Sequence, residues 1–449
     1  MVRRVRVALA LILSLTATVH SASPKVVITS PDNGEIDVDP TITEIRVEYD
    51  QPMSPDGMSI LGGGPNFPQR SGQITWANPK TLVMPVTLKP DQQYRMNFNS
   101  DTNRNFQNAR GESAEWYPLR FKTRAAGAAP AEPDVTPEQN KDALAELKRV
   151  IDEEYSYRDR KKVDWAKEIE KRRAKFEAAK SANEFARLTT HLLRLAEDAH
   201  VTVEAGDVRL GTHANSAPPN FDVAMLNKAV PGWKEHATGI ITGRFDDGIG
   251  YILFSNCSKQ QAFGFDAVLA ELKDAKALVL DVRMNAGGDE LAARRVAGRF
   301  IEESAVYSKN RLRGGGNWKG PFDRVVEPRK DAERYEKPVA VLIGPKVGSS
   351  AESFVLMMKH GAGAKLIGGV TKGSSGRPMR HQLGNGVTVY LSSWEDQLPD
   401  GTVLEGRGIR PDTVIKTTPE DFESADPVLD AALKLLRRKD AQAAKAPAQ

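Results

Sequence analysis

The segment that decides the fold is Val339–Met358, VAVLIGPKVGSSAESFVLMM. Its first five residues predict a buried strand, and the apolar run 354–358 predicts a helix. Ser349 and Ser350 stand on the tight turn between the two. A serine on such a turn exposes its hydroxyl, and the free N–H groups of the next helical turn can bind an oxyanion. An ordinary helix N-cap has the same pattern, so other segments must decide.

Two other segments carry related signals. Val279–Asp289 is an apolar strand that runs into Gly287 and Gly288 before a predicted helix. Glycines let the backbone approach a ligand closely and leave N–H groups uncovered, although an ordinary strand–helix turn looks the same. Leu192–Thr202 predicts the end of a helix, with His200 at the start of a β-like alternation. Taken alone, His200 would be a surface histidine at a helix end.

In this order, the segments resemble the C-terminal-processing and tricorn-type serine peptidases. The resemblance covers about residues 140–420 and rests on four motifs: Asp198–Val201, Asp281–Gly288, Gly348–Glu352 and Leu404–Asp412. It implies that Ser349 is the nucleophile, that His200 is its general base, and that Glu405 orients this base. The implied oxyanion donors are the backbone amides of Ser350 and of Gly288 or Gly287. The chemistry is consistent, because a serine hydroxyl needs a base whose tautomer a third group fixes.

The sequence departs from the family pattern at the expected base and beside it. The processing branch carries a lysine about 25 residues after the nucleophile, but that count reaches Ser374 here, and the nearest basic residues are Lys372 and Arg377. A histidine base is therefore favoured over a lysine base. Tricorn-like proteins carry a serine before the histidine and three glycines in the turn, where this chain has Ala199 and Ala286. The resemblance therefore implies that His200 is less well oriented than the histidine of the family.

Residues 1–22 resemble a secretory signal. Three arginines precede the short apolar stretch 7–19, and small residues end at Ala22, which favours a cleaved signal over a retained anchor. We therefore expect a secreted or periplasmic protein with no membrane span after cleavage.

Beyond residue 22 the pattern changes several times. In residues 25–124, stretches that alternate apolar and polar residues between turn signals predict an all-β sandwich of about seven strands, and their sequence resembles bacterial Ig-like modules.

About 80 residues separate His200 from Asp281, too few for the PDZ domain that many processing peptidases insert there. The glycine-rich stretch Arg311–Trp318 predicts a surface loop or a substrate lid. The expected organisation is an Ig-like sandwich (25–124), a linker (125–138), a helical cap (139–200), an α/β core resembling the ClpP/crotonase fold (201–437) and a disordered tail (438–449).

Composition excludes several functions. A formal net charge of +4 over 449 residues argues against nucleic acid as the main partner. Cys257 is the only cysteine, so no intrachain disulfide can form, and its place at the end of an apolar strand predicts a small buried residue. No histidine spacing suggests a metal site, and no cofactor is implied.

The sequence therefore predicts an exported serine endopeptidase that acts on peptides or unfolded proteins. A non-catalytic protein that binds peptides or small ligands on the same fold is the alternative, motivated by Ala199 and Ala286. A crotonase-type acyl-CoA enzyme is a third possibility that export argues against. The oligomeric state does not follow from the sequence.

Overall fold

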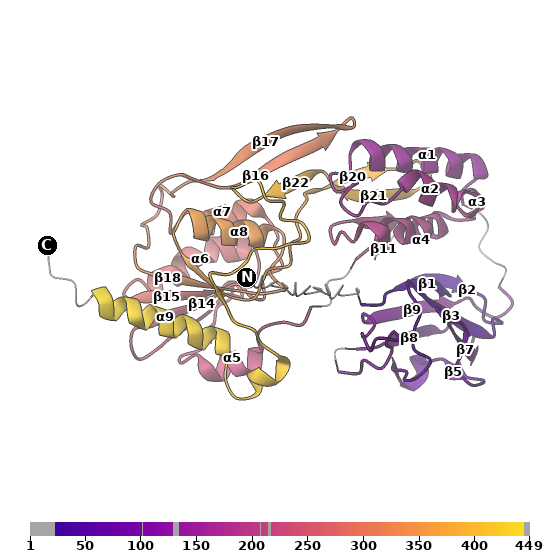
Figure 1. Cartoon of the computed structure of the whole chain (residues 1–449), viewed down its shortest axis with the longest axis horizontal. Coiled ribbons are helices and arrows are strands. Elements are labelled where there is room, and N and C mark those ends of the chain that lie inside the picture. The colour runs from indigo at the N-terminus through magenta and orange to yellow at the C-terminus, as the bar shows by residue number, and fades with distance from the viewer. Residues whose placement is uncertain (1–22, 101, 129–133, 207, 214–216, 444–449) are drawn as a thin grey trace, which may run out of the picture. The chain divides into compact units, whose positions relative to one another are not determined.

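The computed structural model describes residues 23–100, 102–128, 134–206, 208–213 and 217–443, with side chains as far as residue 438. The chain divides into two compact units, Met1–Ala128 and Ala129–Gln449, which Figure 1 colours by position. The expected signal, 1–22, and residues 444–449 of the expected tail lie outside the described residues. Residues 438–443 of that tail are helical instead of disordered, because they continue the last helix, Pro427–Ala443. Within them, no helix combines the length and the apolar character that crossing a bilayer requires.

The first unit is β-rich and encloses one apolar core. Alternating burial in β3 and β8 turns one face of each sheet inward, as the period-2 pattern predicts. Side chains from both sheets, among them Ile45, Tyr94 and Leu119, form a single buried cluster. One sheet has the order β1-β3-β7-β5, with β6 also on β7: β1 (Val26–Ser30), β3 (Glu44–Tyr49), β5 (Gln69–Arg70), β6 (Thr75–Asn78) and β7 (Thr81–Thr87). The other has the order β2-β9-β8-β4: β2 (Glu35–Val38), β4 (Ile60–Leu61), β8 (Gln93–Phe98) and β9 (Tyr117–Thr123).

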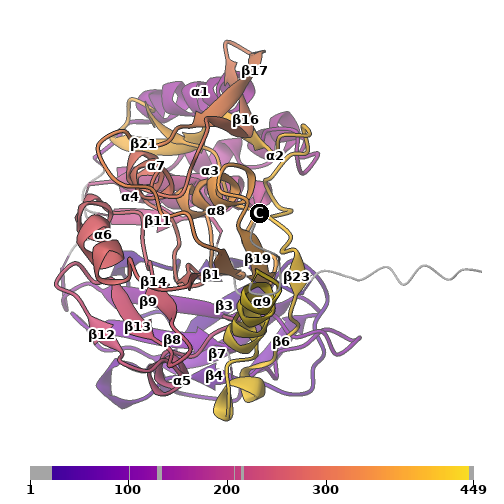
Figure 2. The ribbon, with the colours of Figure 1, turned by 90° about the vertical axis from the view of Figure 1, so that its left-hand side faces the viewer.

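The second unit is built on a seven-stranded sheet of order β12-β13-β14-β15-β18-β19-β23. From β14 to β23 neighbouring strands are parallel, and β12 and β13 add an antiparallel edge. The central strands are continuous apolar runs, as expected where both faces of a parallel sheet are covered. The bounds are β12 (Lys234–Glu235), β13 (Ile241–Arg244), β14 (Ile249–Leu253), β15 (Ala277–Asp281), β18 (Val339–Ile343), β19 (Lys365–Gly368) and β23 (Thr413–Val414); Figure 2 shows several of them in succession.

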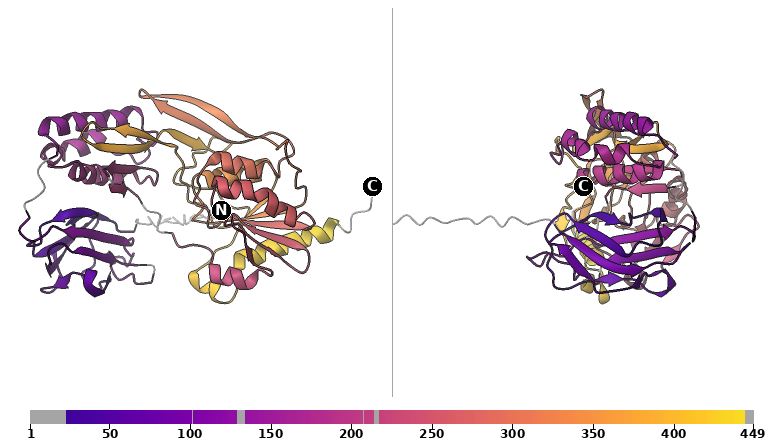
Figure 3. Two further views of the ribbon diagram at one scale, coloured as in Figure 1. Left: turned by 180° about the vertical axis from the view of Figure 1, so that it is seen from behind. Right: turned by 90° about the vertical axis from the view of Figure 1, so that its right-hand side faces the viewer.

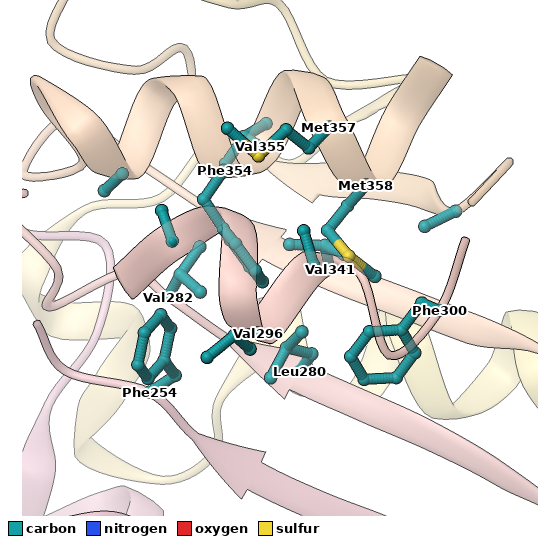
Figure 4. Close-up of a cluster of buried hydrophobic side chains, with 14 of the residues drawn as sticks. Phe254, Leu280, Val282, Val296, Phe300, Val341, Phe354, Val355, Met357 and Met358 are labelled. Carbon is teal, nitrogen blue, oxygen red and sulfur yellow. The ribbon is translucent and has the colours of Figure 1, made fainter. Parts of the chain in front are cut away.

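Helices cover both faces of this sheet (Figures 1 and 3). One face carries α6 (Lys259–Glu271), α7 (Glu290–Ala297) and α8 (Ser350–His360); the other carries α5 (Val223–Ala229) and α9 (Pro427–Ala443). Alternate strand residues enter the two cores: Leu280 and Val341 pack under α7 and α8 (Figure 4), whereas Val279 and Leu342 pack toward α9. The turns after β15 and β18 therefore lie next to each other at one edge of the sheet.

A second layer of this unit combines helices with strands from a distant part of the chain. The helices are α1 (Pro137–Glu153), α2 (Trp165–Glu170), α3 (Arg173–Glu177) and α4 (Ala182–Leu193). Their shared core includes a sheet of order β11-β10-β21-β20, made of β10 (Thr202–Ala205), β11 (Val208–Gly211), β20 (Pro378–Gln382) and β21 (Val387–Ser392). The expected boundary at residue 200 therefore does not close a core, because the helices need these strands to cover their apolar faces.

The glycine-rich stretch around residue 314 is not a loop. It is the tip of a long hairpin of β16 (Ala305–Gly314) and β17 (Asn317–Val326), and β16 also pairs with β22 (Trp394–Gln397). Arg311 stacks on Trp318, with its guanidinium carbon 4.1 Å from the ring centroid. Cross-strand pairing and this stacking order the stretch that composition alone predicts to be irregular.

Candidate active site

Two turns meet at the carboxyl ends of β15 and β18, which are neighbouring parallel strands. A Cβ atom placed on Gly287 would lie 2.8 Å from the Gly348 carbonyl oxygen and 2.8 Å from Ser349 Cβ. Gly287 also has φ +108°. Only glycine allows this approach, so the two motifs form one surface.

Ser349 has an unusual backbone conformation, with φ +55° and ψ −131°. Residues with a Cβ rarely adopt it, and strain of this kind costs about 1–3 kcal/mol and clusters at functional sites. The side chain makes no N-cap hydrogen bond; the Ser349 carbonyl oxygen instead accepts from the Glu352 amide at 2.8 Å. The partly exposed hydroxyl therefore does not act as an ordinary cap.

Two backbone amides in the turns that meet here lack an acceptor among the described residues: those of Ser350 and Gly288. The Gly287 amide, which we expected as an alternative oxyanion donor, donates to Asn285 Oδ1 at 2.9 Å. That expectation is corrected, because an amide already bonded to a buried side chain is not free for a ligand. Ser350 Oγ donates to the Gly288 carbonyl oxygen at 2.7 Å and ties the two turns together.

The charged residues of the glycine-turn motif are structural. The fully buried Arg283 guanidinium donates to Asp281, which ends β15, and to Asp426, just before α9. Asp426 Oδ1 also accepts from the amides of Val428 and Leu429 at 3.0 and 2.9 Å. The motif therefore pins the last helix against the sheet.

His200 follows a turn at the end of the helical layer and is largely buried. Its Nδ1 lies 3.2 Å from Ser374 Oγ and 3.8 Å from Asp198 Oδ1. Burial lowers the pKa of His200, the nearby Asp198 carboxylate opposes this shift, and the positive charge of Lys372 adds to it. Nδ1 is thus engaged, and burial favours the neutral form of the imidazole.

Asp198 is fully buried and fixed from three sides. Its Oδ1 accepts from the His200 amide at 2.8 Å, and its Oδ2 accepts from Tyr155 Oη at 3.1 Å and Ser392 Oγ at 2.8 Å. An extended segment would keep the Asp198 side chain beside that of His200 but not facing it. The segment is a turn instead, since the Val201 amide donates to the Asp198 carbonyl oxygen at 3.2 Å, and this brings the two side chains together.

Glu405 does not contact His200. Its Oε2 accepts from the Ser375 amide at 2.8 Å, and no hydrogen bond or ion pair to His200 is found within the described ranges. The direct contact we expected is corrected: the Gly406 amide donates to the Gly373 carbonyl oxygen at 2.7 Å, which folds the Glu405 turn onto the backbone at 373–375. Burial, with Asp198 nearby, raises the pKa of Glu405 well above its ordinary value.

A turn at residues 373–375 joins these groups, and sequence reasoning missed its importance. The amides of Gly373 and Ser374 each donate to the buried Glu352 carboxylate at 2.8 Å, and the next amide donates to Glu405. Burial raises the pKa of Glu352 to about 7, against these hydrogen bonds. The one sequence signal was the place of Ser374, 25 residues after Ser349.

The remaining candidate groups have little chemical use here. Burial raises the pKa of the Cys257 thiol to about 12, so it is neither a ready nucleophile nor a metal ligand. In the part of the chain that the structure describes, no cluster of three or more His, Cys, Asp or Glu side chains could hold a metal ion.

Parts of this chain are similar to known proteins. Residues 248–415 match the model of peptidase family S41; the range includes Ser349, Glu405 and the glycine turn but not His200. A candidate CtpA-like serine protease of Staphylococcus aureus strain COL is 29% identical over 155 residues, which is 34% of this chain and 30% of that protein. The carboxy-terminal processing protease CtpB of Bacillus subtilis is 25% identical over 190 residues, 40% of this chain and 36% of CtpB.

The match to these curated relatives thus spans about a third of their length. Among solved structures, a candidate peptidase from Parabacteroides merdae has 28% sequence identity and a TM-score of 0.58, covering 67% of this chain and 97% of that one. This structural likeness covers a larger share of the chain than the family match does. The family match, these relatives and this fold agree with a peptidase family S41 domain over residues 248–415.

Proposed function

We propose that this protein is an exported serine endopeptidase in which Ser349 attacks the peptide carbonyl. The observation that carries the proposal is the Ser349 hydroxyl, which caps no helix and stands on a strained turn next to the free amides of Ser350 and Gly288. Such donors stabilise a tetrahedral intermediate, and deleting one costs about 3–4 kcal/mol in known enzymes.

In the proposed reaction, His200 removes the proton of Ser349 as the new bond to the carbonyl carbon forms. The oxyanion lies between the Ser350 and Gly288 amides. The imidazolium then gives its proton to the leaving amine, and water hydrolyses the acyl-enzyme by the same steps. With Nδ1 engaged, the nitrogen that would accept the proton is Nε2.

Glu405 keeps a place in this proposal, but it acts through the turn at 373–375. Its carboxylate holds the Ser375 amide, next to the serine that contacts the imidazole. Asp198 is the carboxylate beside the ring and would stabilise the imidazolium directly.

Peptides or unfolded proteins are the proposed substrates because the family acts on such chains, and export is proposed from the pattern of residues 1–22. The β-rich first unit is proposed to be an Ig-like spacer or binding module.

The test is labelling of the purified protein with a fluorophosphonate probe, followed by peptide mapping. We expect label on Ser349, none in Ser349→Ala, and hydrolysis of an unfolded protein such as casein by the wild type only. Ser350→Ala is the matched control: it keeps the amide and loses one neutral hydrogen bond to Gly288, so its rate should fall by no more than about tenfold. A dead Ser350→Ala beside an active Ser349→Ala would show that the register is wrong.

A non-catalytic binding protein remains the second candidate, on a specific observation. No hydrogen bond joins His200 to Ser349 among the described residues. Catalytic hydrogen bonds are often long in unliganded enzymes and tighten with substrate. Absence of label on the wild type, with tight peptide binding, would favour the binding protein.

A further inference from the structure

We propose that Ser374 is the positioning residue of this site: it orients the His200 ring through Nδ1 and holds the backbone of Ser349. This inference rests on the proposed peptidase function and deepens it. Ser374 stands where the processing branch of the family carries its lysine, but a hydroxyl cannot serve as that base, so its part must be different.

The geometry places Ser374 between the nucleophile and the base. Its carbonyl oxygen accepts from the Ser349 amide at 2.7 Å, and its hydroxyl lies 3.2 Å from His200 Nδ1. One residue therefore contacts both partners of the proton transfer. Since Ser349 is strained, an acceptor for its amide helps to hold the conformation that exposes the hydroxyl.

The turn that carries Ser374 is held rigidly. Glu352 and Glu405, both largely buried, accept from three consecutive amides of this turn, those of residues 373, 374 and 375. Thr371 Oγ1 adds a further hydrogen bond to Glu352. A site needs its positioning groups locked by such supporting contacts, because small displacements of reacting groups slow the reaction greatly.

The tautomer follows from the charges around Nδ1. If Nδ1 carries the proton, it can donate to Ser374 Oγ, and the Asp198 carboxylate 3.8 Å away favours that proton. Nε2 then keeps its lone pair for the Ser349 proton. In the opposite tautomer Nε2 would carry a proton and His200 would be no base. Ser374 thus supplies a hydroxyl contact to the His200 ring, which the side chain of Ala199 cannot supply.

The experiment measures the rate of fluorophosphonate labelling of Ser349 against pH in three proteins: wild type, Ser374→Ala and Ser353→Ala. Ser353 is the matched control, because both serines are 4% exposed and Ser353 Oγ accepts from Arg324 Nη2 at 3.4 Å, with no hydrogen bond to His200 among the described residues. We expect Ser374→Ala to slow labelling by about tenfold or more. Its acid limb should also move to lower pH, because the imidazolium loses an acceptor. Ser353→Ala should show neither change.

A purely structural role would lower the rate without moving the pH limb. Ser374→Cys keeps the shape and replaces the hydroxyl by a weak acceptor; it should show the same two changes if Ser374→Ala unfolds, as judged by thermal melting. If Ser374→Ala or Ser374→Cys labels like Ser353→Ala at every pH, the inference is wrong while the peptidase proposal stands. If the wild type itself is not labelled at Ser349, the proposed function fails and this inference fails with it.

Discussion

At the scale of single residues, the site depends on which polar groups are already satisfied. Asn285 occupies the Gly287 amide and leaves the Gly288 amide open, and Glu405 is occupied by the Ser375 amide. Two side chains facing the His200 ring nitrogen, from Asp198 and Ser374, remain to orient the imidazole. Each of these roles follows from hydrogen-bond capacity, because an amide or a carboxylate oxygen that is already bonded is not free for the substrate or the imidazole.

The pH dependence of activity tests the identity of the base. Burial lowers the pKa of His200, so the imidazole stays neutral below its ordinary value of about 6.5 and the acid limb of kcat/KM should lie below that pH. Lys372→Met removes a charge that lowers this pKa, and should therefore move the limb to higher pH while activity is retained. Loss of activity in Lys372→Met, together with an active His200→Gln, would identify a lysine base instead.

At the scale of elements, turns bonded to helix side chains carry the site. The first turn of α8 supplies Glu352, which fixes the turn at 373–375, while Arg283 after β15 fixes the start of α9. Helices and strands thus position the site residues, and buried charged side chains connect the ends of these elements to the neighbouring turns. Because breaking one side of a buried pair leaves the other uncompensated, such charges are sensitive points of the fold.

Glu352→Gln should weaken the turn at 373–375. Both oxygens of the Glu352 side chain accept hydrogen bonds from this turn, whereas in glutamine only the amide oxygen can accept. Burial raises the pKa of Glu352 from 4.5 to about 7, so the folded chain holds this proton more tightly than the unfolded chain between those values. The stabilisation from the proton is complete below pH 4.5 and is lost as the pH rises through about 7. In urea unfolding, the stability of wild type relative to Glu352→Gln should therefore fall over this range. The exposed Glu303→Gln should show no such trend, and a difference that rises with pH would contradict the prediction.

Asp426→Ala should destabilise the second unit by about 3–5 kcal/mol, because it leaves the buried Arg283 with one carboxylate partner and removes the acceptor before α9. Asp430→Asn, at an exposed position of the same helix, should change stability by less than about 0.5 kcal/mol. Urea denaturation of both variants is the measurement. Equal stability of the two would mean that the Arg283 cluster does not hold α9.

At the scale of the whole molecule, the two units have separate cores. The members of the apolar cluster of the first unit all lie between residues 26 and 121. The members of the three clusters of the second unit all lie at Ala143 or later in the chain. Every proposed catalytic residue lies in the second unit. A compact unit with its own core is expected to fold by itself.

A chain of residues 134–449 should therefore fold and be labelled by the fluorophosphonate probe at the wild-type rate, and residues 23–128 should fold separately. Calorimetry of the full chain should show two transitions that match those of the pieces. Loss of folding in the 134–449 piece, with normal secondary structure in the full chain, would show that the units depend on one another.

The sequence by itself determined the local elements and the motifs on them. The apolar runs 277–281 and 339–343 predicted buried strands, Gly287 marked a turn of close approach, and the order of the motifs indicated the family that the comparisons support. These features are legible because periodicity and backbone freedom act over a few residues.

Only the tertiary structure decided which buried donor meets which acceptor. The pairing of Glu405 with Ser375, the contact of Ser374 with His200, and the completion of the helical layer by β20 and β21 all join residues far apart in the chain. Local pattern contains no information on such pairs, since each polar group could be satisfied by several partners. The packing of whole elements determines which partner lies within about 3 Å of it.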